Sequence, residues 1–345
     1  MVLAVIGAVI WFWWPQKHPK KVEKREPVIR ASAVVAPPVP PVEKSRPKPI
    51  VITPQPPADF PRPVRDVLEA QAALARRAIS PGSIDAAIGS QTRAAIAAFQ
   101  RSQKLVESGL LDTNTRALLT LGAPLLSSYM VTTNDLARLQ PLGKTWLAKS
   151  EQSALDYETI QELVAEKAHS HPLLVQKLNP NVTWMNISAG TVLKITEVNY
   201  PEPDGKAAFI IIHLSGKFLE AFDAETNLLA HFPCSIATKV EKRPVGELHV
   251  AVVAPNPNYT FDPAVFPESP EAQAIGHKLI LPPGPNNPVG VAWIGLDKPG
   301  YGMHGTPAPE QVGRTESHGC FRLANWDAEY LLRLAWVGLP VEVVP

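Results

Sequence analysis

The sequence predicts a multidomain α+β protein, in which a small three-helix domain precedes a β-rich domain of the sandwich or barrel kind. Two observations support this prediction. Residues 65–122 place apolar side chains at helical spacing in three successive segments. From Ala207 onward, short runs rich in β-branched and aromatic residues alternate with Gly and Pro turns. The length of 345 residues allows two or three domains.

The chain opens with an unbroken apolar run, residues 1–14, and we interpret residues 1–15 as a signal peptide or a membrane anchor. As a helix the run would span about 21 Å, which is shorter than the roughly 30 Å hydrocarbon core. Its Trp11, Trp13 and Trp14 suit a membrane interface. The lysines that follow would favour the cytoplasm by the positive-inside rule, but the chemistry below favours export. A buried N-terminal helix or strand is the alternative.

Residues 16–64 form a proline-rich linker. Proline at this density blocks both helices and sheet ladders, so we expect a semi-rigid, polyproline-like spacer. Such a spacer would carry folded modules away from a membrane surface. A ligand for a proline-recognition domain is the minor alternative.

Three helices are expected within residues 65–122, with Ser90 as an N-cap of the second and Asp112 of the third. This segment resembles the peptidoglycan-binding domain type 1 family. The matching residues are Gln71, Leu74, Gly82, Ile84, Asp85, Gly89, Thr92, Ala95, Phe99, Gln100, Leu105, Gly109, Leu111, Asp112 and Thr115. A helical domain without wall binding is the alternative.

Residues 142–198 read as helix, turn, helix and a short strand. The stretch "ELVAEKAHSHPLLVQKLNP" followed by "AGTVLKI" resembles a LysM-like glycan-binding module. His169 and His171 lie two residues apart, so they would point to different sides of a helix, and Pro172 interrupts it. We therefore expect solvent-exposed turn histidines rather than metal ligands.

Composition excludes some functions. The net charge is +1, which gives no basis for nucleic-acid binding. The two cysteines, Cys234 and Cys320, make no disulfide framework. A bond between them would block the thiol at position 320, so we expect both to be free. Cys234 lies in the apolar stretch "HFPCSIAT" and reads as a small core residue.

Cys320 has a different setting, because histidine, glycine and arginine surround it in "SHGCFRLANWD". A cysteine attacks only as the thiolate, and a neighbouring imidazole can take its proton. His318 and His304 are the two candidates for that imidazole. Gly319 would keep the amide of Cys320 accessible as an oxyanion donor and take an unusual φ. Arg322 offers a planar fork for a carboxylate.

"HGTP", beginning at His304, and "SHGCFRLANWD" closely resemble the L,D-transpeptidase (YkuD) catalytic domain, as do "PVGELHV" and "PPGPNNPVGVAWIGL". The resemblance covers residues 207–345, and only Phe321 and Leu323 depart mildly from its aliphatic pattern. A structural Cys/His cluster is the alternative. Zinc is disfavoured because one thiolate and two histidines lack a fourth ligand.

The resemblance implies roles for particular residues. Cys320 would be the nucleophile, His304 the base, and His318 a second imidazole that supports the thiolate. Gly319 and Cys320 would supply oxyanion-hole amides. The expected catalytic residues are thus Cys320, His304, His318 and Gly319, and the expected substrate-binding residues are Arg322, Ser317 and Gly305.

The implied function is a peptidoglycan L,D-transpeptidase of the periplasm or cell envelope that needs no metal or other cofactor. It would cleave the bond before the terminal D-alanine of a tetrapeptide stem and pass the acyl group to an amine. A diamino acid would give a 3–3 cross-link, and a protein lysine would attach that protein to the wall. The N-terminus would associate with the inner membrane. The alternatives are an L,D-carboxypeptidase on the same fold and a non-enzymatic wall-binding protein.

Overall fold

The computed structural model describes residues 60–314 and 319–345. The expected signal peptide or anchor, residues 1–15, and nearly all of the linker, residues 16–64, lie outside the described part. The same holds for Ser317 and His318. Within the described ranges, no helix has the length and apolar character needed to cross a membrane.

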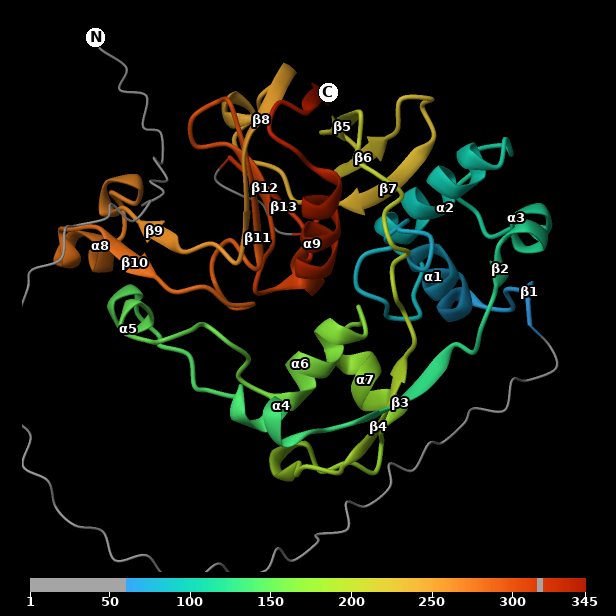
Figure 1. Cartoon of the computed structure of the whole chain (residues 1–345), viewed down its shortest axis with the longest axis horizontal. Coiled ribbons are helices and arrows are strands. Elements are labelled where there is room, and N and C mark those ends of the chain that lie inside the picture. The colour runs from blue at the N-terminus through green and yellow to red at the C-terminus, as the bar shows by residue number, and fades with distance from the viewer. Residues whose placement is uncertain (1–59, 315–318) are drawn as a thin grey trace, which may run out of the picture. The chain divides into compact units, whose positions relative to one another are not determined.

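The first unit is the predicted three-helix domain (Figure 1). Its elements are β1 (Arg62–Pro63), α1 (Val67–Ala75), α2 (Ser90–Ser102), α3 (Thr113–Leu118) and β2 (Thr120–Leu121). Asp112 caps α3 as predicted, with its side chain accepting from the amide of Thr115. The Ser90 prediction was wrong, because Gly89 is the N-cap of α2 and makes no side-chain cap bond. Leu74, Ile96, Phe99 and several alanines are among the residues that form the core of this unit.

A second unit pairs two strands around helices. Its elements are β3 (Leu126–Met130), α4 (Thr133–Ala137), α5 (Trp146–Ser150), α6 (Ile160–Lys167), α7 (Pro172–Leu178), a 3-10 turn (Trp184–Asn186) and β4 (Val192–Thr196). β3 and β4 are antiparallel, with Leu126 opposite Thr196. The predicted helix, turn, helix and strand are therefore present. The unit also includes β3, which lies before residue 142 and had no place in the sequence prediction.

The two turn histidines differ from expectation. The ring of His169 stacks on Trp326 at 5.1 Å between centroids and contacts the edge of Tyr200 at 4.7 Å. Burial lowers the pKa of His169 to about 3, so the solvent-exposed prediction was wrong for this residue. His171 caps α7, where its Nδ1 accepts from the amide of Leu173 at 3.1 Å.

The β-rich unit is an eight-stranded sheet in the order β13-β12-β11-β8-β14-β5-β6-β7. Its strands are β5 (Phe209–His213), β6 (Phe218–Phe222), β7 (Leu228–Pro233), β8 (Gly246–Pro255), β11 (Ala292–Leu296), β12 (Gly302–His304), β13 (Phe321–Arg322) and β14 (Pro340–Val344). An antiparallel bridge between Ser235, just after β7, and Arg322 of β13 joins the two ends of this order. The sheet therefore curls toward a barrel, and the predicted fold class is confirmed.

One helix and one small appendage complete this unit. Helix α9 (Asn325–Leu334) packs on β8, β11 and β12, as Figure 1 shows. Asn325 is a residue type that often caps helices, but here it is the first helical residue, and the N-cap is Ala324, which makes no side-chain cap bond. The appendage consists of β9 (Tyr259–Phe261), α8 (Pro270–Ile275) and β10 (Leu279–Leu281), and shares a small core with Trp146 of α5.

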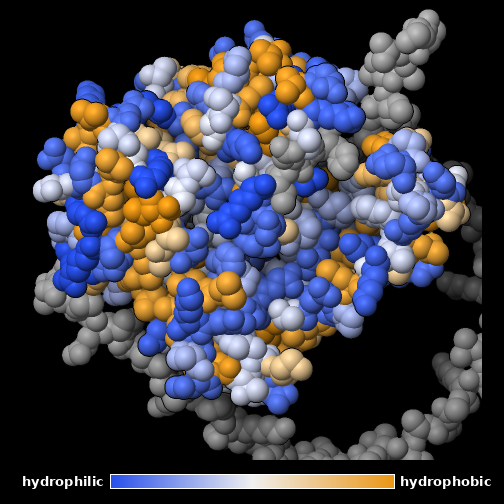
Figure 2. Space-filling view, turned by 180° about the vertical axis from the view of Figure 1, so that it is seen from behind, coloured by the Kyte–Doolittle hydropathy of each residue, from blue (hydrophilic) through white to orange (hydrophobic). Residues whose placement is uncertain are grey.

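The three units pack against one another through polar as well as apolar contacts. The amide of Ser80 donates to His231 of edge strand β7 at 2.8 Å. Its hydroxyl lies 3.1 Å from a carboxylate oxygen of Asp327 on α9, which also accepts from Tyr200. Figure 2 shows one face of the molecule, where apolar residues lie in separate patches among hydrophilic ones. The helical units are therefore packed onto the β-rich unit, and not merely tethered to it.

Candidate active site

The register of β11, β12 and β13 decides which side chains share a face. Met303 pairs with Phe321, and both are buried in the main core beneath α9. His304 pairs with Arg322 on one side and with Trp293 of β11 on the other. Because side chains alternate along a strand, His304, Arg322 and Trp293 point away from that core. Cys320 stands two residues before Arg322 and packs against the cluster of Trp293 and Ala254 on this same face.

The imidazole of His304 is held in one tautomer. Its Nδ1 lies 2.7 Å from the carbonyl oxygen of Gly305, which can only accept, so Nδ1 carries the proton. The ring stacks on Trp293 at 5.6 Å between centroids, and the residue is 4% exposed. Burial lowers the pKa of His304 to about 4. The ring is therefore neutral at pH 7, with a lone pair on Nε2 that can accept a proton.

The thiol of Cys320 is half-buried. Burial raises its pKa to about 11, while a hydrogen bond from the Gly302 backbone and the charge of Arg322 act in the opposite direction. Its Sγ lies 3.4 Å from the carbonyl oxygen of Gly300, to which it donates. In the resting state both the thiol and the imidazole of His304 are thus neutral.

Two tyrosines, Tyr259 and Tyr301, also border the thiol. Burial raises the pKa of Tyr259 to about 12, and the charge of Cys320 adds to the rise in both phenols. Tyr259 packs on the same cluster as Cys320. Neither tyrosine was singled out from the sequence, although "PNPNYTF" and "KPGYGMH" place them where a turn leads into a strand. Aromatic residues in such turns are the signal that would have found them.

The predicted glycines have different surroundings. A Cβ on Gly319 would have Tyr301 as its nearest neighbour, at an ordinary 3.7 Å. The unusual φ expected for Gly319 stays a prediction, because the residue before it lies outside the described part. Gly305 is buried, and a Cβ there would lie 2.2 Å from Oδ1 of Asn325. Its carbonyl accepts a hydrogen bond from Nδ1 of His304, and the expected contact of Gly305 with substrate stays a prediction.

Arg322 is anchored through its backbone. Its amide and carbonyl both bond to Ser235, at 3.1 and 2.8 Å. Its charge adds to the lowering of the pKa of His304 and opposes the rise that burial causes in the pKa of Cys320. Cys234, by contrast, is fully buried in the main core, and burial raises its pKa to about 12. The prediction that Cys234 is a core residue is confirmed.

A half-buried thiol on the same sheet face as a neutral, tautomer-locked imidazole is the type of site that nucleophilic acyl-transfer enzymes use. Residues 207–343 match the family model for the L,D-transpeptidase catalytic domain, and residues 64–119 match that for a putative peptidoglycan binding domain. The chain therefore carries an L,D-transpeptidase catalytic domain, and it is an enzyme of that kind with a peptidoglycan-binding domain ahead of it.

Curated relatives carry related names. The chain is 25% identical over 188 residues to the putative L,D-transpeptidase YkuD of Bacillus licheniformis, covering 54% of this chain and 94% of that protein. It is 28% identical over 183 residues to the probable L,D-transpeptidase YbiS of Escherichia coli K12, covering 49% of this chain and 55% of the relative. It is 36% identical over 105 residues to the putative L,D-transpeptidase YqjB of Bacillus subtilis, covering 29% and 51%. The chain thus spans about half the length of the last two relatives.

Among solved structures, the L,D-transpeptidase (residues 123–326) from Xylanimonas cellulosilytica aligns with a TM-score of 0.34. The identity is 13%, over 84% of this chain and 98% of that one. L,D-transpeptidase 3 from Mycobacterium tuberculosis aligns with a TM-score of 0.32 at 16% identity, over 46% and 77%. TM-scores this low support no conclusion beyond the likeness itself.

Proposed function

We propose that this chain is a peptidoglycan L,D-transpeptidase in which Cys320 is the nucleophile and His304 the base. The observation that carries the proposal is the parallel pairing of β12 with β13, which directs His304 and Arg322 to one face beside Cys320. The lone pair on Nε2 of His304 supports the role of base, because Nδ1 is occupied by Gly305.

The neutral state of both groups favours proton transfer during the attack. As Sγ of Cys320 bonds to the carbonyl carbon of the third stem residue, Nε2 of His304 takes the thiol proton. The tetrahedral intermediate collapses, and D-alanine leaves with that proton on its amine. The product is a thioester on Cys320. An incoming amine then attacks the thioester and gives its proton to His304, which returns it to the sulfur as the thiol re-forms.

Other groups near the thiol take supporting roles in the proposal. The backbone amide of Cys320, next to Gly319, would donate to the developing oxyanion. Arg322 would bind a substrate carboxylate or order the site, in keeping with its charge reaching both His304 and Cys320. His318 and Ser317 keep the roles expected from the sequence, as support for the thiolate and for substrate binding.

The acyl acceptor separates a transferase from a hydrolase. Purified protein incubated with tetrapeptide muropeptides should yield 3–3 cross-linked dimers by mass spectrometry, because an amine acceptor resolves the thioester. Tripeptides without dimers would identify a carboxypeptidase and refute the transferase. If the stem peptide is instead transferred to a lysine-containing protein that is added to the reaction, the enzyme attaches proteins to the wall. If no product of any kind forms although the protein still binds the wall, the protein is a non-enzymatic wall-binding protein.

The remaining units would hold the enzyme on its insoluble substrate. Residues 65–122 would bind the wall, and the succession of α6, α7 and β4 within residues 142–198 supports the proposal of a LysM-like glycan module there. Such binding raises the local substrate concentration. Localisation in the periplasm or cell envelope, with residues 1–15 as signal or inner-membrane anchor, completes the proposal. Co-sedimentation of Cys320→Ala protein with purified sacculi tests the binding role, and protein left in the supernatant would refute it.

A further inference from the structure

Asn325, the first residue of α9, is 1% exposed and uses both ends of its amide. Its Oδ1 accepts from the backbone amides of Thr306 at 3.1 Å and Val291 at 3.4 Å. Its Nδ2 donates to the carbonyl of Pro285 at 3.1 Å and to the carboxylate of Glu166, 3.1 Å from Oε2. This side chain therefore connects the loop after β12 to the second unit, which contains α6.

Two glycines make room for that amide. A Cβ on Gly290 would lie 2.0 Å from Oδ1 of Asn325, and a Cβ on Gly305 would lie 2.2 Å from it. Gly290 also has a φ of 62°, in the left-handed region that favours glycine. The approach of Asn325 to the backbone of this loop is thus built into the local sequence, since any larger residue at either position would displace the amide.

The contact of Asn325 with Thr306 acts on His304 through one rigid peptide group. The N–H of Thr306 and the C=O of Gly305 belong to the same planar peptide. Asn325 holds its N–H end, and His304 Nδ1 donates to its C=O end at 2.7 Å. A rotation of this peptide would remove the acceptor that keeps the proton on Nδ1. Fixing its N–H therefore fixes the tautomer that leaves Nε2 as the base.

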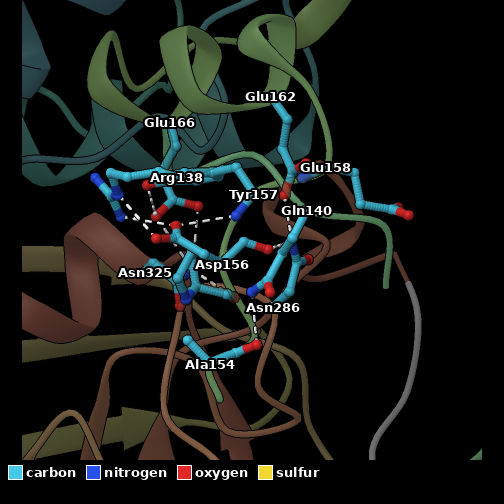
Figure 3. Close-up of polar contacts among 11 residues, drawn as sticks. Arg138, Gln140, Ala154, Asp156, Tyr157, Glu158, Glu162, Glu166, Asn286 and Asn325 are labelled. Atoms are coloured by element: carbon cyan, nitrogen blue, oxygen red, sulfur yellow. Dashed lines mark hydrogen bonds and ion pairs between the residues drawn. The ribbon is translucent and has the colours of Figure 1, made fainter. Parts of the chain in front are cut away.

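At its other end, this series of hydrogen bonds reaches Glu166 on α6 of the second unit. The carboxyl of Glu166 accepts from Asn325 and from the hydroxyl of Tyr157 at 3.1 Å. Figure 3 shows Glu166 and Tyr157 pointing from the helical unit toward Asn325. With Oδ1 committed to the loop and Nδ2 to Glu166, the amide cannot flip without losing bonds at both ends.

We propose that Asn325 is a positioning residue for His304 and that Glu166 holds it, so that the unit carrying α6 is part of the active-site framework. This inference rests on the proposed role of His304 as base. It assigns the helical unit a task beyond glycan binding, because removal of one carboxyl on α6 would loosen the imidazole.

The neighbouring Asn286 provides a matched control. It is also buried, and its Nδ2 donates to Glu162 at 2.6 Å and to the carbonyl of Asp156 at 3.0 Å. It therefore ties the unit that contains α6 to the β-rich unit, but among the described residues its side chain forms no hydrogen bond with residues 304–306. Asn286→Leu breaks the packing between the units without touching the peptide that holds His304.

The experiment compares full-length Glu166→Leu, Glu166→Gln, Asn325→Leu and Asn286→Leu with the natural protein. Histidine-selective ¹⁵N NMR reports the tautomer of His304, whose signal is assigned by its loss in His304→Gln. Muropeptide kinetics separate kcat from KM, and thermal unfolding reports Tm. We expect Glu166→Leu and Asn325→Leu to lower kcat about 10- to 100-fold at similar KM and to move the Nδ1 signal away from the protonated form. Glu166→Gln, which can still accept from Asn325, should restore most of kcat.

Asn286→Leu should lower Tm but leave the tautomer and kcat near those of the natural protein. An unchanged tautomer in both Glu166→Leu and Asn325→Leu, or an equal loss of kcat in Asn286→Leu, would overturn the inference. The NMR signal does not depend on turnover. A natural protein without transpeptidase activity but with a locked His304 would therefore refute the proposed function alone.

Discussion

His304 lies opposite Arg322 in the parallel pairing of β12 with β13. Two segments separated by a loop are thereby joined at adjacent positions of one sheet, with the carbonyl of His304 accepting from the amide of Leu323 at 2.8 Å. The neighbouring pair, Met303 and Phe321, enters the core, so the face that carries His304 cannot rotate inward. The sheet itself thus places the imidazole on the side of Cys320.

The thiol of Cys320 should be indispensable, whereas that of Cys234 should not. Cys320→Ala removes the nucleophile, so turnover of tetrapeptide should be undetectable while the protein still binds sacculi. Cys234→Ala is the matched control, because this residue is fully buried in the main core. It should cost about 1 kcal/mol of stability and keep its activity. Equal loss of turnover in the two variants would show that the wrong cysteine had been chosen.

Replacing His304 by Ala should lower kcat by about 10²- to 10⁴-fold, the usual contribution of a general base. The exposed His277 supplies the control, and His277→Ala should act like the natural protein. Steady-state rates with a tetrapeptide stem measure both. If the His304→Ala enzyme keeps its full activity, another group must be the base.

The pH dependence follows from the two neutral groups. His304 has a pKa of about 4 and must be neutral to accept the proton, so acylation should fall as the pH drops through about 4. The thiol has a pKa of about 11, so its alkylation by iodoacetamide should rise about tenfold per pH unit toward that value. Alkylation that already reaches its plateau near pH 6 would indicate a thiolate–imidazolium pair and contradict this account.

Glycine substitutions beside the site should have opposite outcomes. Gly305→Ala puts a Cβ 2.2 Å from Oδ1 of Asn325, so we expect a loss of about 2 kcal/mol or more of stability together with lower activity. Gly319→Ala meets nothing closer than 3.7 Å among the described residues, so its fold should be unaffected. Chemical denaturation of both variants tests the contrast. A Gly305→Ala protein as stable as the natural one would show that the Asn325 contact is dispensable.

The grouping of the proposed site residues was partly predictable, because they stand in short motifs. Cys320, His304 and Arg322 stand in two stretches whose residue types suit a thiol nucleophile, and the alternating strands around them indicated a curved sheet. The burial of Cys234 followed from its apolar neighbours. In these cases local sequence and tertiary structure agree, so reasoning from the residues was sufficient.

The residues that support the proposed site could not be predicted, because they depend on contacts between segments that are far apart in the sequence. Asn325 is a residue type that often caps helices, yet its side-chain amide forms hydrogen bonds with Glu166 and Thr306. His169 looks like a turn histidine but stacks on Trp326, 157 positions further along by residue number (326 minus 169). Strand β3, which pairs with β4 from a distant part of the chain, was not predicted from the sequence. Such choices are made by tertiary packing.

The most direct test of the central claim is to find the acyl group itself. The protein is mixed with a tetrapeptide stem in the absence of an amine acceptor, quenched in acid, digested and mapped by mass spectrometry. The account predicts a thioester-linked tripeptide on the peptide that contains Cys320, together with one released D-alanine for each thioester formed. Release of D-alanine with Cys320 unmodified, or equal release by Cys320→Ala, would contradict it.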